Sequence, residues 1–183
     1  PHWEAEYPGI GQCIDEILQF EGVYRGWQIA PVNMCLSQRG NPKVVEDKGP
    51  EQIIAWEDGT VEILRSGTDF YHHTIAWPVK HRQDWLRVRA RHLQADDPKR
   101  FPEDWPRYVE EFSNRDYPLQ LTHRGVYGFA RDLMGDERLA YAFYDEPDLV
   151  HEIMDYYTEM AITLWEKMVA DVEFDLIECW EDM

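Results

Sequence analysis

The chain has 183 residues, enough to bury one sizeable hydrophobic core, and its 14% aromatic content, with 8 Trp, is typical of a packed or ligand-lined interior. The formal net charge of −18 at pH 7 repels phosphate backbones and anionic membranes, so we expect neither nucleic acid nor a membrane as a partner. We find no signal peptide and no apolar run of membrane length. Cys13, Cys35 and Cys179 lack the spacing of a disulfide framework, so a reducing cytoplasm is expected.

Short elements are expected in the first half of the chain. Residues 2–5 are predicted to form a first strand, and residues 13–20 have apolar positions at the spacing of an amphipathic helix. Between residues 42 and 66, β-rich runs flank Asp58-Gly59, a dipeptide typical of hairpin turns. We expect this hairpin to be an excursion from the main fold.

Longer elements are expected in the second half. A helix is predicted over residues 83–93, a strand over Tyr117–Thr122, and then a helix that Gly135 ends. The clearest helix has Pro147 in its first turn. Its predicted core positions recur at helical spacing over six turns: Leu149, Ile153, Tyr157, Met160, Leu164 and Met168.

The last predicted strand, Phe174–Trp180, is apolar enough to be buried and leads directly into Glu181 and Asp182. Strand, helices and strand in this order predict a βαβ unit and therefore a parallel sheet. Parallel α/β folds place their chemistry at the carboxyl ends of strands. The chain is therefore expected to end where an active site begins.

Several short segments of the chain, taken together in their order and spacing, are specific for one protein family. They are Tyr117–Thr122, Leu133–Gly135, Tyr144–His151 and Trp180–Met183, with agreement from Pro1–Glu4 and from the connector between Pro78 and Pro102. In these residues the chain resembles the uroporphyrinogen decarboxylase superfamily. The resemblance implies a (β/α)8 barrel, which takes ~250 residues. The expected fold is therefore α/β: residues 1–183 as a truncated domain, a partial (β/α)8 TIM-type barrel of roughly the first half, with the β-hairpin of residues 42–66 inserted.

The superfamily contains two chemistries: decarboxylation of a porphyrinogen without a cofactor, and transfer of methyl groups among corrinoid proteins, thiols, folates and methylated substrates. A polyanionic porphyrinogen needs arginines directly after the first strand. The corresponding segment, Trp3–Tyr7, has two acids and no arginine, and the tyrosine of decarboxylases would fall near Asp132. We therefore expect methyl transfer from a methylated substrate to a corrinoid or folate acceptor. Uroporphyrinogen decarboxylase, an enzyme of porphyrin biosynthesis, is the alternative.

Residues that follow or end predicted strands are the candidates for catalysis: Glu4, His123, Glu181 and Asp182. Carboxylates in such places bind cations, stabilise charge on a methyl donor or act as acid or base, but they also cap the helices that follow. A histidine at a strand end can donate a proton, although a structural histidine is the more frequent case. Arg124, Trp3 and Trp77 are expected to contact a small-molecule substrate, and core packing is the alternative for the tryptophans.

No metal site is expected in these residues, because the histidines and cysteines are scattered and the adjacent His72 and His73 diverge on a strand. The zinc ligands of thiol-methylating family members would lie beyond Met183. We expect the fragment alone to bind no cofactor, and we expect corrinoid or tetrahydrofolate, with a possible corrinoid protein partner, for the parent enzyme. A non-catalytic fragment or subunit stays open as a second class of function. The last strand is expected to have an unpaired apolar edge, so we expect the chain to self-associate or to pair with a second chain that completes the fold.

Overall fold

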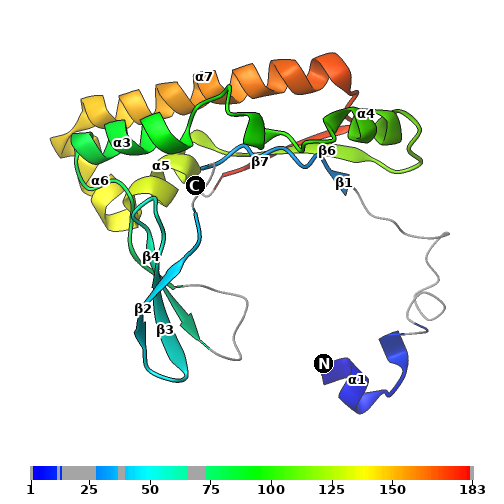
Figure 1. The fold of residues 1–183 in the computed structure, drawn as a ribbon, viewed down its shortest axis with the longest axis horizontal. Helices are drawn as coiled ribbons and strands as arrows, with labels where there is room; N and C mark the ends of the chain where they lie inside the picture. Colours follow the sequence, from blue (N-terminus) through cyan, green and yellow to red (C-terminus); the bar gives the residue numbers. More distant parts are fainter. Residues whose placement is uncertain (1, 12, 14–27, 37–39, 66–72, 182–183) are drawn as a thin grey trace.

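The computed structural model describes residues 2–11, 13, 28–36, 40–65 and 73–181. Figure 1 shows the arrangement of the helices in this part of the chain. They are α1 (His2–Glu6), α3 (Arg82–His92), α4 (Trp105–Ser113), α5 (Val126–Met134), α6 (Asp136–Asp145) and α7 (Pro147–Asp171), with a 3₁₀ turn η1 (Pro98–Arg100). None of the described helices is both long and apolar enough to cross a lipid bilayer.

The described strands form two separate sheets. One is parallel, with the order β1 (Gln28–Ile29), β6 (Leu119–Arg124), β7 (Leu176–Trp180). The other is antiparallel, with the order β2 (Lys43–Asp47), β3 (Glu51–Ala55), β4 (Val61–Arg65), β5 (His73–Ala76). In Figure 1, α3 and α7 lie along one side of the parallel strands, and the antiparallel sheet projects from the other side. We call the parallel sheet with helices α3 to α7 the parallel layer.

The expected partial TIM-type barrel is wrong. The described residues form a mixed α/β architecture in which a three-stranded parallel sheet and a four-stranded antiparallel sheet stay separate, and neither closes into a barrel. The predicted parallel pairing is confirmed, since β6 and β7 are parallel. Every parallel α/β fold contains such a strand–helix–strand unit, so the pattern does not specify whether the sheet curves and closes into a barrel. The expected first strand, residues 2–5, is also wrong, because these residues lie in helix α1.

The predicted periodicity of α7 is confirmed. All six predicted core positions are at most 3% exposed and pack into one core with residues of α5 and α6: Leu149, Ile153, Tyr157, Met160, Leu164 and Met168. Full burial of one such side chain contributes roughly 1.5–3 kcal/mol. The helix predicted to stop at Gly135 is α5, and Gly135 has a φ of 77° that suits a residue without a β-carbon. The parallel layer is therefore organised by α7.

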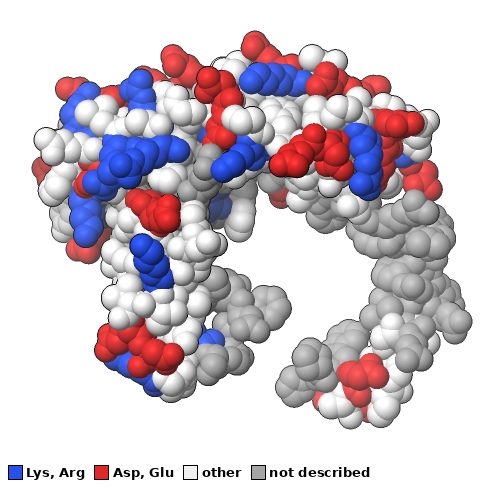
Figure 2. All heavy atoms as spheres, in the orientation of Figure 1, with Lys and Arg blue, Asp and Glu red and all other residues white. Residues whose placement is uncertain are grey.

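Basic side chains gather over α3 in Figure 2, and two arginines of this helix contact α7. Arg82 forms an ion pair with Glu152 of α7, and Arg89 lies 3.5 Å from the same carboxylate. The indole Nε1 of Trp85 also donates to Glu152, at 3.1 Å, and the Trp85 ring is fully buried. One glutamate thus joins three side chains of α3 to the long helix.

The prediction that the last strand, β7, is buried is wrong. It pairs in parallel with β6, as the βαβ pattern predicts, but it forms an edge of the parallel sheet and all five of its residues are exposed. Ile177 is 72% exposed and Trp180 60%. An apolar run is buried only where another element covers it, and no described strand lies on the outer side of β7.

The antiparallel sheet is held mainly by backbone pairing. The expected turn at Asp58-Gly59 joins β3 and β4, where the Asp58 carboxylate accepts from the Thr60 N–H at 2.8 Å. Ile54 is 4% exposed, whereas every residue of β2 is exposed. This sheet forms one wall of the candidate site.

Candidate functional site

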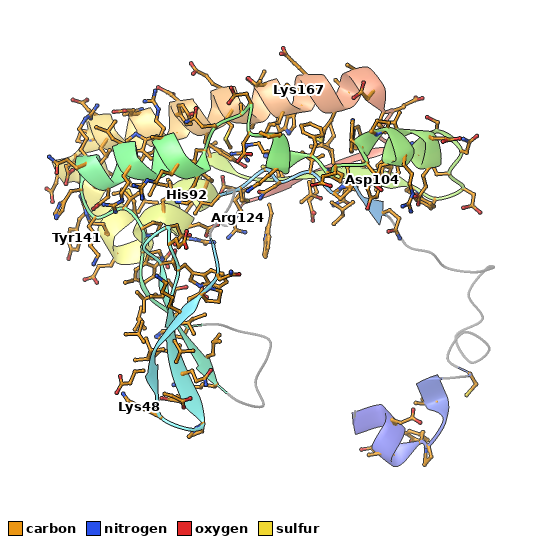
Figure 3. The ribbon with its side chains drawn as sticks, in the orientation of Figure 1. Lys48, His92, Asp104, Arg124, Tyr141 and Lys167 are labelled. Atoms are coloured by element: carbon orange, nitrogen blue, oxygen red, sulfur yellow. The ribbon has the colours of Figure 1, made fainter. Side chains whose placement is uncertain are left out.

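Arg124, the last residue of β6, has a side chain fixed from two directions. Its guanidinium forms a bidentate ion pair with Asp132 of α5, with Nε–Oδ2 and Nη2–Oδ1 distances of 2.7 and 2.9 Å. It also lies 4.6 Å from the centre of the Trp180 ring, at the end of β7. Such planar, paired contacts orient all the groups involved. Figure 3 shows Arg124 where the parallel layer meets the antiparallel sheet.

Glu181 follows β7 and holds the first turn of α5. Its carboxylate accepts from the backbone N–H of Tyr127 at 3.1 Å and of Gly128 at 2.7 Å. The first N–H groups of a helix lack intrahelical partners, and the helix dipole favours a negative charge there. A β-carbon on Gly125 would overlap the Glu181 carboxylate, so this approach requires glycine. Glu181 thus fixes the direction of the helix that carries Asp132.

His123 and Tyr157 meet at the backbone carbonyl oxygen of Arg124. The Tyr157 hydroxyl donates to this oxygen at 2.9 Å, and Nδ1 of His123 lies 2.8 Å from it. The His123 ring also packs edge-on against Trp165, with 4.6 Å between ring centres. Burial raises the pKa of the Tyr157 hydroxyl, so this group remains a hydrogen-bond donor. Both side chains therefore brace the carboxyl end of β6.

A buried arginine holds the chain segment opposite Arg124. Arg100 is 1% exposed and donates to the carbonyl oxygens of Asn33 at 2.7 Å and Cys35 at 2.9 Å. Burial lowers the pKa of its guanidinium, and the charge of Asp97 opposes this shift. Hydrogen bonds to a charged group contribute roughly 1.5–3 kcal/mol net. The turn η1 thus fixes the path of residues 33–35 beside the strand ends.

Two adjoining hollows lie at this junction and share Cys35 and Asp132. The outer hollow has a volume of about 450 Å³, and its walls include Asn33, Cys35, His123, Arg124, Asp132 and Trp180. The inner hollow has a volume of about 260 Å³, and its walls include Cys35, Glu62, Thr74, Trp77, Phe129 and Asp132. The larger volume lies within the usual range of small-molecule sites.

Cys35 contributes a protonated thiol to both hollows. Part of the residue is exposed, but the surrounding protein raises the pKa of the thiol by burial, and the nearby Asp132 carboxylate raises it further. The positive charges of Arg124 and Arg100 lower the pKa of this thiol, but less than burial and Asp132 raise it. A thiol in this state is a poor nucleophile at neutral pH.

The structure brings some of the expected site residues together and separates others. His123, Arg124 and Trp77 line the two hollows, and Glu181 lies behind them as the support of α5. Glu4 accepts instead from the N–H groups of its own segment, at Gly9 and Gly11, and Figure 1 shows α1 apart from both sheets. The Trp3 side chain and Asp182, which were both expected at the site, lie outside the described residues.

The sequence analysis did not select Cys35, Glu62 or Asp132 for the site. Glu62 had a detectable signal, since it interrupts an apolar strand run from Val61 to Leu64. Cys35 had none, because its place depends on contacts with residues distant in the sequence, such as the hydrogen bond from Arg100 to its carbonyl oxygen. Among the residues that the structure describes, no three His, Cys, Asp or Glu side chains converge as ligands for a metal ion.

A scan against family models, a search of curated proteins and a search of solved structures each give no match.

Proposed function

We propose that the two hollows form a site that transfers a methyl group from a small methylated substrate to a nucleophilic acceptor. The observation that carries the proposal is the charge of the walls. Arg124 is the only Lys or Arg among the described lining residues, and Asp132 pairs with it, while Glu62 adds a second carboxylate. Among the lining residues, one formal positive and two formal negative charges sum to minus one with His neutral, and the guanidinium of Arg131 lies 3.8 Å from Asp132 outside this set.

Walls of this sign support methyl transfer over decarboxylation of a porphyrinogen. A porphyrinogen carries several carboxylates, and these would enter the site without unpaired cations to receive them. A methyl carbon under attack gains partial positive charge, which fixed carboxylates stabilise. The chain resembles a superfamily that contains both chemistries, so these are the two reactions to compare.

The proposed step exchanges one bond for another. The bond from the methyl carbon to its heteroatom breaks, and the electron pair of that bond leaves with the heteroatom. A new bond forms to the same carbon from an electron pair of the acceptor. Asp132, held by Arg124, faces the developing charge, and the adjoining hollows place donor and acceptor next to each other.

The outer hollow is where we propose that the acceptor approaches. Its volume of about 450 Å³ suits the pterin ring of a folate, and the indole of Trp180 offers a flat surface at its rim. A corrin ring is larger and fits only from the open side, presented by a carrier protein. His123 is poorly placed to bind cobalt through Nδ1, because that atom faces the carbonyl oxygen of Arg124.

The test is a methyl-transfer assay with cob(I)alamin or tetrahydrofolate as acceptor, and choline or a phenyl methyl ether as donor. We expect protein-dependent methylation of one acceptor and a fall on the order of tenfold or more for Asp132→Asn. Asp136→Asn is the matched control, since its side chain is 80% exposed on α6. Consumption of uroporphyrinogen with release of carbon dioxide, retained in Asp132→Asn, would show that the proposal is wrong. Unfolding curves of both variants separate loss of activity from loss of fold.

The proposed setting of this reaction is the cytoplasm, because Cys13, Cys35 and Cys179 are all free thiols, as expected in a reducing compartment. Self-association, or pairing with another chain, is also proposed. Its support is the exposed edge strand β7, with Ile177 and Trp180 on it. A sedimentation profile of monomers alone at micromolar concentration would count against such pairing.

A further inference from the structure

The inner hollow combines carboxylates with aromatic rings in a small volume. We propose that it binds an organic cation with a methylated onium head group, and that this cation is the methyl donor. The second clause rests on the proposed methyl transfer, whereas binding of the cation does not.

The carboxylates come from two different parts of the molecule. Glu62 belongs to β4 of the antiparallel sheet and is 7% exposed, and Asp132 belongs to α5 of the parallel layer. The indole Nε1 of Trp56 donates to Oε2 of Glu62 at 2.9 Å, which fixes the orientation of that carboxylate. Asp132 is oriented by its bidentate pair with Arg124. Both acids are thus held in place before any ligand enters.

The aromatic walls are equally fixed. The ring of Trp77 lies so close to Gly135 that an added β-carbon there would come within 2.7 Å of it. Phe129 stacks on Tyr157 with 3.9 Å between ring centres and an interplanar angle of 9°. Rings held in this way are ready to face a cation, and tryptophan gives the strongest cation–π attraction of the side chains.

The remaining walls select the kind of cation. Leu36 and Leu133 line the hollow beside the rings, and no Lys or Arg occurs among its described lining residues. A quaternary ammonium group has no N–H donors and spreads its charge over methyl groups, so it loses little hydration on entering such a wall. A metal ion would leave strong hydration behind, because no three His, Cys, Asp or Glu side chains of the described residues converge as ligands.

An onium donor also suits the chemistry that the site offers. When its methyl carbon is attacked, the C–N bond breaks and the electron pair stays on nitrogen, which departs as a neutral amine. This departure needs no proton, whereas an alkoxide leaving from a methyl ether does. The volume of about 260 Å³ limits the ligand to a compact head group.

The decisive probe is choline, compared with its neutral isostere 3,3-dimethylbutan-1-ol, by isothermal titration calorimetry and NMR. We expect choline to bind about tenfold more tightly than the isostere. Glu62→Gln should weaken choline binding by about tenfold and leave the isostere unchanged. Glu46→Gln is the matched control, on an exposed side chain of the same antiparallel sheet, and should change neither. Equal affinity for the two probes, or an equal effect of both substitutions, would overturn the inference.

Trp77→Phe is a second variant that tests the site if Glu62→Gln does not fold. This variant keeps a ring with a weaker attraction for cations, so choline binding should fall about threefold while the isostere is retained. An unchanged affinity for choline in a folded Trp77→Phe variant also counts against the site. If choline binds and its binding depends on Glu62, but no methyl transfer occurs, the cation site is supported and the proposed function is wrong. If methyl transfer from ethers occurs but choline does not bind, the proposed function is supported and the cation site is wrong.

Discussion

The parallel layer and the antiparallel sheet are stabilised in different ways. In the parallel layer, α7 alone buries seven apolar residues to 3% exposure or less. In the antiparallel sheet, Ile54 is the only buried apolar residue of the described strands β2 to β5, and β2 is exposed along its whole length. One part depends on packing between layers, and the other on strand pairing and turns. The proposed site takes one wall from each part.

The largest expected effect is the loss of packing in the parallel layer. Leu164→Ala should lower the free energy of unfolding by about 3 kcal/mol, because Leu164 is fully buried and its removal leaves a cavity. The matched change in the other part is Val45→Ala on β2, where Val45 is 65% exposed. It should cost less than about 1 kcal/mol. Urea denaturation measures both, and equal costs would contradict the contrast between the parts.

Gly135→Ala tests the contact between the two parts. Gly135 has a φ of 77° and a ψ of 159°, a region that is essentially restricted to glycine, and Trp77 covers it. We expect a loss of about 2 kcal/mol and a change in tryptophan fluorescence. Gly49→Ala, at a φ of 80° with no atom within 4 Å, is the control for backbone strain alone. It should cost about 1 kcal/mol and leave the fluorescence unchanged.

Glu181→Ala tests the support of α5 within the parallel layer. Removing the carboxylate leaves the N–H groups of Tyr127 and Gly128 without their partner, so we expect a loss of about 1 kcal/mol. Hydrogen exchange at these two amides should accelerate, while amides of the antiparallel sheet stay as they are. Glu173→Ala, at an exposed position before β7, is the control and should change neither quantity. Unaltered exchange at Tyr127 in Glu181→Ala would contradict the capping role.

The smallest expected effects concern two acids, one in each part. The N–H of Leu119 and the guanidinium of Arg115 lower the pKa of Asp175, and the N–H of Gly49 and the amide of Gln52 lower the pKa of Asp47. A lowered pKa stabilises the fold above the ordinary value of 3.8, and this stabilisation is lost as pH falls through the lower folded value.

Asp175→Asn and Asp47→Asn should therefore be less stable than the parent near pH 7, and the difference should shrink at about pH 3. Asp175 joins residues far apart in sequence, so its loss should affect global unfolding. The bonds of Asp47 lie within one turn, so its loss should affect only local opening. Urea denaturation at both pH values, with hydrogen exchange, distinguishes the two. A difference that widens on acidification would contradict the direction of the pKa shifts.

The pairing of two strand ends was accessible from the sequence, but the composition of the candidate site was not. Parallel strands β6 and β7 end side by side at Arg124 and Trp180, as the order of the elements predicts. The role of each side chain depended on close contacts that a sequence does not contain. Asp132 joined the site through its ion pair with Arg124, and Glu62 joined it from another sheet.

The sequence by itself determined three features of the parallel layer: periodicity the core face of α7, Gly135 the stop of α5, and the order of the elements the parallel pairing of the last two strands. The first two features are local, since each is set by residues within a few turns or by one hydrophobic stripe. Only the tertiary structure decided that no barrel forms among the described strands, that residues 2–6 are helical and that β7 is exposed. The curvature of a sheet and the burial of a strand depend on which elements cover it, and that depends on contacts between residues distant in the sequence.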